Sequence, residues 1–347
     1  MPPPYGGMAN WSRMVVDELQ NRGVEFDVID TSTRRRSVDG RTLYERFLVR
    51  GFDIFRMKRH LARSIRRGSK VVHIAASGSF AVIRDIVLLR YARRRGVATV
   101  YHLHFGRVSD IQRRNTWEWR ALHLAISLSS VTLAIDRTTF EALSTVVDPE
   151  RLAYVPNPIE MESLPRAGTP EHHRVMFLGW LIPSKGVSEL LEAWGRFYSE
   201  HPDWTLQLVG PVDPDTRSRL ESTYSLAGVD MCGEQDHAKA MRTLSECSIF
   251  ILPSYSEGFP YALLEAMALG KAAIATRVGS IPDMLAGECG VLVDPHSWED
   301  ILQALEQFAN DPEKRTQCGR RAQAKAREEY DLQVVLPQYI HHWASRA

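Results

Sequence analysis

The sequence lacks the features that mark several classes of protein. No run of about 18 consecutive apolar residues occurs, so no membrane-spanning helix is expected. The N-terminal MPPPYGG has neither a charged n-region nor an apolar h-region, so a signal peptide is not expected. The four cysteines form no CxxC pair, which argues against a zinc knuckle or a redox motif. We therefore expect a cytoplasmic protein whose cysteines are small buried side chains.

The charge is nearly balanced overall but not along the chain. The 347 residues are 44% hydrophobic and 24% charged, which suggests two ordinary globular domains. The formal net charge is +1. Residues 1–165 nevertheless carry 26 Lys and Arg against 17 Asp and Glu, and the remainder carries 17 against 25. A basic half and an acidic half indicate that the two halves meet different partners.

Short apolar segments alternate with helical ones in two successive series. In the first series, strands are expected at 24–29, 70–76, 97–104, 130–135 and 151–156. After a Pro/Gly/His-rich break, strands are expected at 174–180, 204–210, 248–254, 271–277 and 290–294. Strand–helix alternation is typical of parallel sheets that are covered on both faces. The pattern predicts an α/β protein of two Rossmann-like, doubly wound domains that face a cleft.

We place the domains at 1–165 and 166–332, and we expect a C-terminal helix at about 333–347 to pack back on the first domain. In a doubly wound domain the first strand is normally central and precedes the first glycine-rich loop. Here the sequence PPPYGG stands at the very start. The N-terminal domain is therefore expected to lack its usual first strand, because the start lies further upstream or because the sheet is incomplete.

The segment EGFPYALLE, residues 257–265, follows an expected buried strand and has a glutamate at each end. Pro260 can occupy the first turn of the next helix, where its missing N–H costs nothing. The following backbone N–H groups would form an anion site suited to a diphosphate, and Gly258 would allow close approach. Glu257 would point across the phosphate, whereas Glu265 could accept hydrogen bonds from two ribose hydroxyls. An isolated pair with this spacing is more often one capping and one solvated glutamate.

Residues 251–295 closely resemble the donor-binding region of family 4 glycosyltransferases. The resemblance extends to 2–10, 155–160, 177–194 and 206–211, so it covers nearly the whole chain. Enzymes of this family have the GT-B fold and hold a nucleotide-sugar mostly through the C-terminal domain. The resemblance implies a retaining glycosyltransferase that moves a sugar from a nucleotide-sugar donor to a lipid-linked or polysaccharide acceptor. The implied setting is bacterial surface polysaccharide or glycolipid synthesis.

The resemblance also implies roles for individual residues of the C-terminal domain. Glu257 matches the glutamate near the donor sugar and its reacting carbon, and Glu265 matches the one that binds the ribose hydroxyls. Lys185 matches the lysine that neutralises the phosphates of the departing nucleotide. The remaining implied donor-binding residues of this domain are Gly179, Gly258, Phe259, Pro260, Tyr261 and Ala262.

The sequence departs from the family pattern at two positions. Trp180 stands where an arginine commonly follows the glycine and helps to hold the diphosphate. The positive charge that stabilises the departing diphosphate is therefore expected to be smaller. Ser280 stands where a second glycine is common, and this change is expected to matter less.

Two features of the N-terminal half also match the family. Gly6 and Gly7 match a glycine pair that faces the donor phosphates, although a simple turn after three prolines fits them equally well. His104 matches a histidine that contacts the donor sugar, and His102 is the second candidate because side chains two apart on a strand share a face. His73 is expected to be structural. The predicted catalytic residues are Glu257, His104 and Lys185.

The expected chemistry needs neither a metal nor another cofactor. Departure of the nucleotide requires stabilisation of the diphosphate charge, which Lys185 and helix N–H groups can supply. No aspartate pair that resembles a D-x-D metal motif stands at a strand end, since the sequence DPD at 213–215 lies in a Pro-rich turn. Two alternatives stay open. The chain could be a catalytically silent GT-B protein that binds a nucleotide-sugar or a partner, or a nucleotide-sugar epimerase of related fold.

The stretch 31–70 carries 13 Lys and Arg against 3 Asp and Glu. Apolar residues interrupt the basic ones at roughly helical spacing, namely Leu48, Phe52, Phe55, Leu61 and Ile65. Such a helix can lie on an anionic membrane, which predicts peripheral contact with the inner face of the plasma membrane. The alternative is a solvated basic face with an inward apolar stripe. Nucleic acid is not an expected partner, because no recognisable binding module accompanies the charge.

Overall fold

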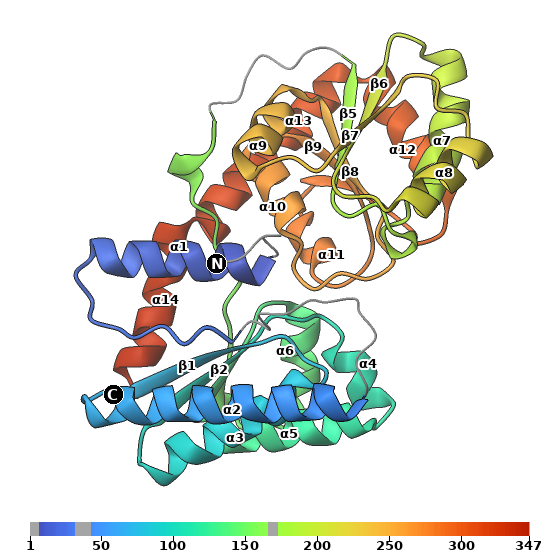
Figure 1. Ribbon diagram of the computed structural model, residues 1–347. Coiled ribbons are helices and arrows are strands. Elements are labelled where there is room, and N and C mark those ends of the chain that lie inside the picture. Colours follow the sequence, from blue (N-terminus) through green and yellow to red (C-terminus); the bar gives the residue numbers. More distant parts are fainter. Residues whose placement is uncertain (1–6, 32–42, 166–172, 347) are drawn as a thin grey trace. The chain divides into compact units, whose positions relative to one another are not determined.

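The structure, a computed structural model, describes residues 7–31, 43–165 and 173–346, without the side chains of residues 43–52. The chain divides into two compact units (Figure 1). Unit 1 comprises Met1–Val155 and Pro337–Ala347, and unit 2 comprises Pro156–Leu336. The sequence analysis placed the boundary at residue 165 and the return of the chain at about residue 333.

Unit 1 contains a parallel sheet whose described strands follow one another in chain order, β1-β2-β3-β4. The strands are β1 (Val71–Ala76), β2 (Ala98–Leu103), β3 (Val131–Ala134) and β4 (Leu152–Tyr154). The helices of the unit are α1 (Gly7–Asn21), α2 (Leu43–Arg66), α3 (Ala81–Arg94), α4 (Val108–Arg113), α5 (Trp117–Leu128) and α6 (Arg137–Ser144). Helices α3 and α5 are crossovers, which parallel neighbours require.

The strand that was expected at 24–29 is not formed, and this prediction was wrong. Val24 and Val28 are 45% and 49% exposed, and the segment pairs with no described strand. An apolar run becomes a strand only where a neighbouring strand edge can pair with its backbone groups. Residues 1–6 lie outside the described residues, and α1 is the first described element.

The two faces of the unit 1 sheet are covered by different side chains. Helices α2, α3 and α5 bury an apolar cluster against Ile74, Tyr101 and neighbouring residues on one face. On the other face, Trp11 of α1 stacks on His73 with ring centroids 5.2 Å apart. Trp11 Nε1 also donates a hydrogen bond to Tyr339 Oη at 3.1 Å. Tyr339 lies on α14 (Leu332–Ala344), which begins in unit 2 and belongs to unit 1 from Pro337 onward.

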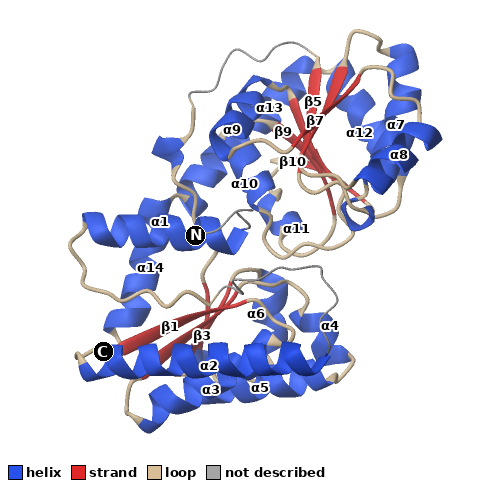
Figure 2. Ribbon diagram, in the orientation of Figure 1, coloured by secondary structure: helices blue, strands red, loops and turns tan. Residues whose placement is uncertain are grey.

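Unit 2 contains a six-stranded parallel sheet of order β10-β9-β8-β5-β6-β7. Its strands are β5 (Arg174–Leu178), β6 (Thr205–Val209), β7 (Val229–Gly233), β8 (Ile249–Leu252), β9 (Ala272–Thr276) and β10 (Gly290–Val293). Its helices are α7 (Val187–Glu200), α8 (Pro214–Thr223), α9 (His237–Glu246), α10 (Tyr261–Ala268), α11 (Ile281–Met284), α12 (Trp298–Asn310) and α13 (Pro312–Lys325). Figure 2 shows α9, α10 and α13 on one face of the sheet and α7, α8 and α12 on the other.

The strand order in unit 2 reverses beside β5. From β5 the chain adds β6 and β7 on one side, and it then returns to add β8, β9 and β10 on the other side. The loops that leave β5 and β8 therefore diverge at the carboxyl edge, and α/β sheets bind ligands at such a switch point. These loops are residues 179–186 and 253–260, and the fold therefore makes them the candidate ligand-binding loops.

All four cysteines are free, and three of them, Cys247, Cys289 and Cys318, are buried. Among the described helices, none has the length and apolar character needed to cross a membrane.

Candidate functional site

The two loops at the switch point of unit 2 carry Lys185 and Glu257. Lys185 Nζ lies 2.7 Å from Glu257 Oε1, which makes a charge-assisted hydrogen bond. The side chains are 25% and 12% exposed, so water screens this pair less than it screens an ordinary surface ion pair. The sequence analysis gave these residues separate roles, and the structure brings their charged groups into direct contact.

The position of Lys185 is fixed by the loop that follows β8. Lys185 ends a short 3₁₀ turn, Pro183–Lys185, and Gly186 follows with a φ of +67°. A Cβ atom at Gly186 would lie 2.0 Å from the carbonyl oxygen of Pro253, so only glycine fits there. Tyr255 N also donates to Ser184 O at 2.9 Å. The loops of the switch point therefore hold each other in place.

The position of Glu257 is fixed by the turn that follows β9. Gly279 has a φ of +55°, and a Cβ atom there would lie 2.2 Å from the carbonyl oxygen of Glu257. The neighbouring Ser280 N donates to Gly258 O at 3.0 Å. Ser280 is only 2% exposed, and its backbone makes this contact although the family pattern commonly has glycine there. Three loops at the carboxyl edge thus pack together around the Lys185–Glu257 pair.

Helix α10 begins directly after the loop that follows β8. Tyr261 is its first residue, and Pro260 is the N-cap residue in an extended conformation without a side-chain cap bond. The prediction that Pro260 lies in the first turn is therefore wrong by one position, because its ψ of 115° is not helical. Phe259 and Tyr261 are buried, and Ala262 is half-buried. The helix N-terminus, with its partial positive charge, follows Glu257 closely in the chain.

Glu265 lies in the second turn of α10 and is only 6% exposed. Its Oε1 lies 2.8 Å from Nε2 of His237, the first residue of α9. The alternative of a solvated glutamate on the outer face is therefore wrong. The sequence analysis did not single out His237, since it did not recognise β7 and so could not place the loop after it at the carboxyl edge.

Gly179 follows β5 and is enclosed by backbone. Its N–H donates to Val209 O at 2.9 Å. Gly210 has a φ of +146°, and a Cβ atom there would lie 1.8 Å from the carbonyl oxygen of Gly179. Trp180, which stands where the family commonly has arginine, is 47% exposed. The loop after β5 therefore has a fixed backbone and an exposed aromatic side chain in place of a cation.

In unit 1, His104 and His102 share a face of the sheet, with ring centroids 4.0 Å apart. Trp11 covers His104 edge-on at 4.8 Å. Burial lowers the pKa values of His104 and His73 to about 3 and holds the pKa of His102 well below its usual range. These imidazoles are therefore neutral at ordinary pH. Within the described residues, both ring nitrogens of His102 and Nε2 of His104 have no hydrogen-bond partner.

His73 lies at the edge of this cluster and accepts a hydrogen bond from Trp343 Nε1 at 3.0 Å through its Nδ1. This contact fits the structural role that was expected for it. Gly7 is the exposed first residue of α1, and Gly6 lies outside the described residues.

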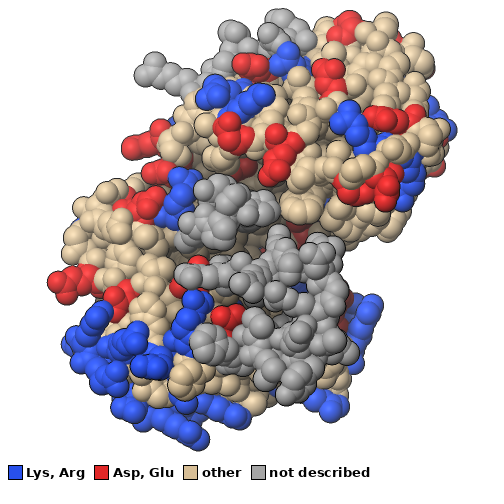
Figure 3. Space-filling model, viewed as in Figure 1, with Lys and Arg blue, Asp and Glu red and all other residues tan. Residues whose placement is uncertain are grey.

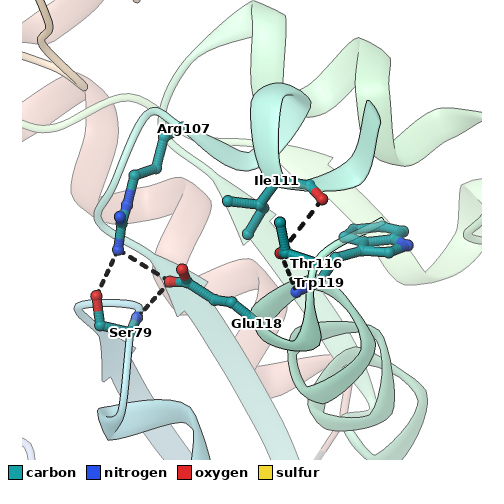
Figure 4. A network of polar contacts seen from close by, with 6 residues as sticks. All are labelled: Ser79, Arg107, Ile111, Thr116, Glu118 and Trp119. Carbon is teal, nitrogen blue, oxygen red and sulfur yellow. Dashed lines mark hydrogen bonds and ion pairs between the residues drawn. The ribbon is translucent and has the colours of Figure 1, made fainter. Parts of the chain in front are cut away.

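A second polar network joins the loops after β1 and β2 (Figure 4). Ser79 has a φ of +54°, and its N–H donates to Glu118 Oε1 at 2.5 Å. Arg107 Nη2 lies 2.9 Å from the same carboxylate oxygen. Glu118 is only 8% exposed, so this network ties both loops to the start of α5. Among the side chains that the structure describes, no group of three or more His, Cys, Asp or Glu could hold a metal ion.

Comparison with known families and relatives decides the class of protein. Residues 165–325 match the family described as glycosyl transferases group 1, and residues 5–163 match glycosyltransferase family 4. The D-inositol 3-phosphate glycosyltransferase of Corynebacterium glutamicum is 31% identical over 93% of this chain and 88% of its own length. The chain belongs to glycosyltransferase family 4. It is therefore a glycosyltransferase, as the motif at 251–295 implied.

A second relative matches only part of this glycosyltransferase. The MMP alpha-(1->4)-mannosyltransferase of Mycolicibacterium hassiacum is 29% identical over 56% of this chain and 48% of its own length. The match thus spans about half of that relative.

Solved structures share the fold. Sucrose-phosphate synthase from Thermosynechococcus elongatus superposes with a TM-score of 0.79 at 18% identity, over 98% of this chain and 93% of that one. Anabaena HepE in complex with UDP gives a TM-score of 0.67 at 18% identity over 82% of each chain. The predicted GT-B fold is confirmed.

Proposed function

We propose that this glycosyltransferase transfers a sugar, with retention of anomeric configuration, from a nucleotide-sugar to a lipid-linked or polysaccharide acceptor. The pathway class is surface polysaccharide or glycolipid synthesis. The observation that carries the proposal is the paired Lys185 and Glu257 at the switch point, followed by the buried Glu265. Structures of similar fold support the choice of donor, since Anabaena HepE was solved with UDP and with UDP-glucose.

Each residue of the proposed donor site has a chemical task. The N-terminus of α10 and Lys185 would neutralise the diphosphate, because both are positive and adjacent in the fold. Lys185 is already paired with Glu257 at 2.7 Å, so a diphosphate must share or replace that contact. Glu257 would then face the donor sugar, and Glu265 would accept the ribose hydroxyls. Gly179, Gly258 and the segment 259–262 would supply close backbone approach.

Two residues of unit 1 keep the roles that the family resemblance implies. His104 is proposed to contact the donor sugar as a neutral hydrogen-bonding group, because its lowered pKa excludes an imidazolium at neutral pH. Its Nε2 is buried without a hydrogen-bond partner among the described residues, so this contact requires the side chains that cover it, such as Trp11, to move aside. Gly7 at the start of α1 is proposed to lie beside the donor phosphates.

The proposed reaction needs no metal and no redox cofactor. The bond from the anomeric carbon to the phosphate oxygen breaks, and the acceptor hydroxyl forms the new bond on the same face. The hydroxyl proton leaves with the departing diphosphate, whose charge the lysine and the helix N-terminus stabilise. Loss of one such stabilising group typically lowers turnover about 100-fold or more.

A donor screen tests the proposal. UDP-, GDP- and ADP-sugars are incubated with the full chain, with and without EDTA, and nucleotide release is measured. We expect release with one base class, equal with and without EDTA, and weaker donor binding in Glu265→Ala. Loss of a charged hydrogen bond costs about 1.5–3 kcal/mol. Glu257→Ala should mainly lower turnover.

Donor binding without turnover would favour the silent alternative, and conversion of the donor sugar without an acceptor would favour an epimerase.

A contact with anionic lipid is the second part of the proposal. The exposed basic side chains of α2, of α3 and of the residue that directly follows each helix form what we call the basic face: Lys58, Arg59, Arg63, Arg66, Arg67, Arg90, Arg93, Arg94 and Arg95. Lys58 and Arg95 both lie over the ring of Tyr91, at 5.4 and 5.2 Å, so the two sets are contiguous. Figure 3 shows the gathering of Lys and Arg over this part of unit 1.

The apolar residues of 31–70 contribute little to that contact. Leu61 is 3% exposed and Ile65 packs against the core, so the inward apolar stripe that was considered as the alternative is right for these two. Phe55, at 57% exposure, is available to a bilayer surface. Leu48 and Phe52 lie outside the described side chains. The proposed attraction is therefore mainly electrostatic, at about 1 kcal/mol for each basic residue near the surface.

Vesicle sedimentation tests the basic face. The protein should sediment with anionic vesicles at low salt, should not sediment with neutral ones, and should detach at high salt. Joint replacement of Arg59, Arg63, Arg66 and Arg67 by glutamine should abolish sedimentation. The matched control replaces four exposed arginines of unit 2, namely Arg217, Arg219, Arg320 and Arg321. Equal loss in both variants would show that only net charge matters.

A further inference from the structure

We propose that His237 is a positioning residue for the donor ribose: it holds the Glu265 carboxylate in the orientation that accepts the ribose hydroxyls. The inference rests on the proposed nucleotide-sugar donor and names a residue that the family pattern did not supply. His237 and Glu265 lie 28 positions apart in the chain, and their side chains meet at 2.8 Å.

The burial of Glu265 explains why it needs a fixed partner. Apart from the hydroxyl of Tyr261, the other buried side chains of α10 are apolar: Tyr261, Leu263, Leu264, Ala266, Met267 and Ala268. A carboxylate in such surroundings is costly unless it is hydrogen-bonded. His237 makes that bond to Oε1. A carboxylate oxygen pair has about four acceptor positions, so Oε2 remains able to accept a hydroxyl while His237 stays in place.

The side chain of His237 is far more exposed than that of its partner Glu265. The Glu265 side chain is 8% exposed, and the His237 side chain is 42% exposed. His237 therefore approaches the buried carboxylate from the solvent side, which is the side from which a donor must enter. A ribose that reaches Glu265 meets His237 on its way, so the imidazole is in a position to influence which sugar is accepted.

The loop that carries His237 is tied to the donor loop. Gly210 N donates to Gly233 O at 2.9 Å, and Gly210 in turn closes on the carbonyl of Gly179. Asp236 caps α9 by accepting from Lys239 N at 2.8 Å, which sets His237 as the first helical residue. A continuous run of backbone contacts thus connects the loops after β5, β6 and β7, and His237 has a fixed position relative to the switch point.

A second histidine–glutamate pair in the same unit provides the control. His201 Nε2 lies 2.9 Å from Glu306 Oε2, and both side chains are partly buried. His201 follows the end of α7, and Glu306 lies on α12, so neither belongs to the loops at the carboxyl edge. The pair has the same chemistry as His237–Glu265 without the proposed role. A purely structural effect of losing a histidine–glutamate contact should therefore appear at both places.

The test compares ribose with 2′-deoxyribose. Affinities of UDP, GDP and ADP and of their 2′-deoxy counterparts are measured by calorimetry for the wild type, His237→Leu, His237→Gln and His201→Leu. We expect the wild type to prefer the ribonucleotide about tenfold or more, which corresponds to about 1.4 kcal/mol. His237→Leu should lose most of this preference, whereas His237→Gln, which keeps a hydrogen-bond donor, and His201→Leu should retain it.

Kinetics supply a readout that a structural role would not change. His237→Leu should raise the donor KM with little change in kcat, because the ribose lies away from the bond that breaks. Should His237→Leu melt far below the wild type, His237→Ala replaces it in the same comparison. An unchanged ribose preference in a folded His237 variant would overturn the inference and leave the proposed function intact. Failure of the wild type to bind any of the nucleotides would overturn both.

Discussion

The carboxyl edges of the two parallel sheets gather different side chains around their central strands. In unit 2 the strand order reverses beside β5, and the diverging loops bring Lys185 and Glu257 together as a charged pair. In unit 1 the described strands follow in chain order, and His102 near the end of β2 and His104 directly after it are packed and neutral. The charged pair of unit 2 therefore lies at the switch point itself, whereas the carboxyl edge of unit 1 holds a packed, neutral histidine cluster and, in separate loops, the Arg107–Glu118 pair.

The two halves of the chain differ in the sign of their net charge. Residues 1–165 hold the excess of Lys and Arg, and the basic face on α2 and α3 concentrates part of it. The remainder of the chain is acidic overall, yet its proposed donor site depends on one lysine and one helix N-terminus. Net charge thus describes long-range attraction, whereas the chemistry of a site depends on a few oriented groups.

The largest effect is expected from Lys185→Met. Removal of the cation should lower turnover about 100- to 1000-fold, because the departing diphosphate loses its main charged partner. The measurement is nucleotide release under saturating donor. Lys314→Met, at an exposed position on α13, is the control and should leave the rate unchanged. Equal activity of the two variants would remove the distinction between the carboxyl edges.

The next effect concerns two glycines of α7, one directly before its first residue and one in its interior. Gly186→Ala forces a left-handed backbone on alanine, at about 1–3 kcal/mol, and places Cβ against Pro253 O. Gly195→Ala lies in the helix interior with no atom within 4 Å of the new Cβ, and it should stabilise by about 0.5–1 kcal/mol. Chemical denaturation measures both. Opposite signs are predicted, and a stabilising Gly186→Ala would show that the switch-point loops are not locked together.

The third prediction concerns pH and unit 1. Burial lowers the pKa values of His73 and His104 to about 3, against about 6.5 in the unfolded chain. Stability from these groups is complete above pH 6.5 and is lost as the pH falls from 6.5 toward 3, because the unfolded state then binds more protons. Each histidine contributes a slope of up to about 1.4 kcal/mol per pH unit. Thermal melts between pH 7.5 and pH 4.5 should reveal this loss.

The smallest effect is expected from His102→Leu at neutral pH. Both ring nitrogens of His102 lack partners among the described residues, so an apolar side chain of similar size should be tolerated. Its consequence should appear in acid, where the variant loses less stability than the wild type. His123→Leu, at an exposed position on α5, is the control and should keep the wild-type pH dependence. A steeper dependence in His102→Leu would contradict the burial argument.

Much of the fold could be predicted because apolar runs and their spacing report on buried strands. Nine of the ten strands of the described residues coincide with expected segments, from β1, which was expected at 70–76, to β10, which was expected at 290–294. The failure at 24–29 has a physical cause, since an apolar segment does not reveal whether a pairing partner exists. β7 was missed because its sequence, VDMCG, has no continuous apolar run.

The sequence analysis named the residues of the candidate site but not the contacts between them. The motif at 257–265 pointed to Glu257 and Glu265, and the lysine came from the family resemblance. The pairing of Lys185 with Glu257 joins residues 72 positions apart, and no local pattern encodes such a contact. His237 was missed because β7 was not recognised, and because its partner Glu265 lies on another helix. Local sequence therefore identifies chemical groups, and the sheet topology decides which of them meet.

Hydrogen–deuterium exchange with and without donor tests the central claim most directly. The full chain is labelled alone and with the nucleotide-sugar that the donor screen selects, and exchange is followed segment by segment. We predict that the donor slows exchange most strongly in residues 184–187 and 257–265 of unit 2, and that Glu265→Ala weakens this protection at the same donor concentration. Protection confined to segments of unit 1, with residues 257–265 unchanged, would contradict the assignment of the donor site to the switch point.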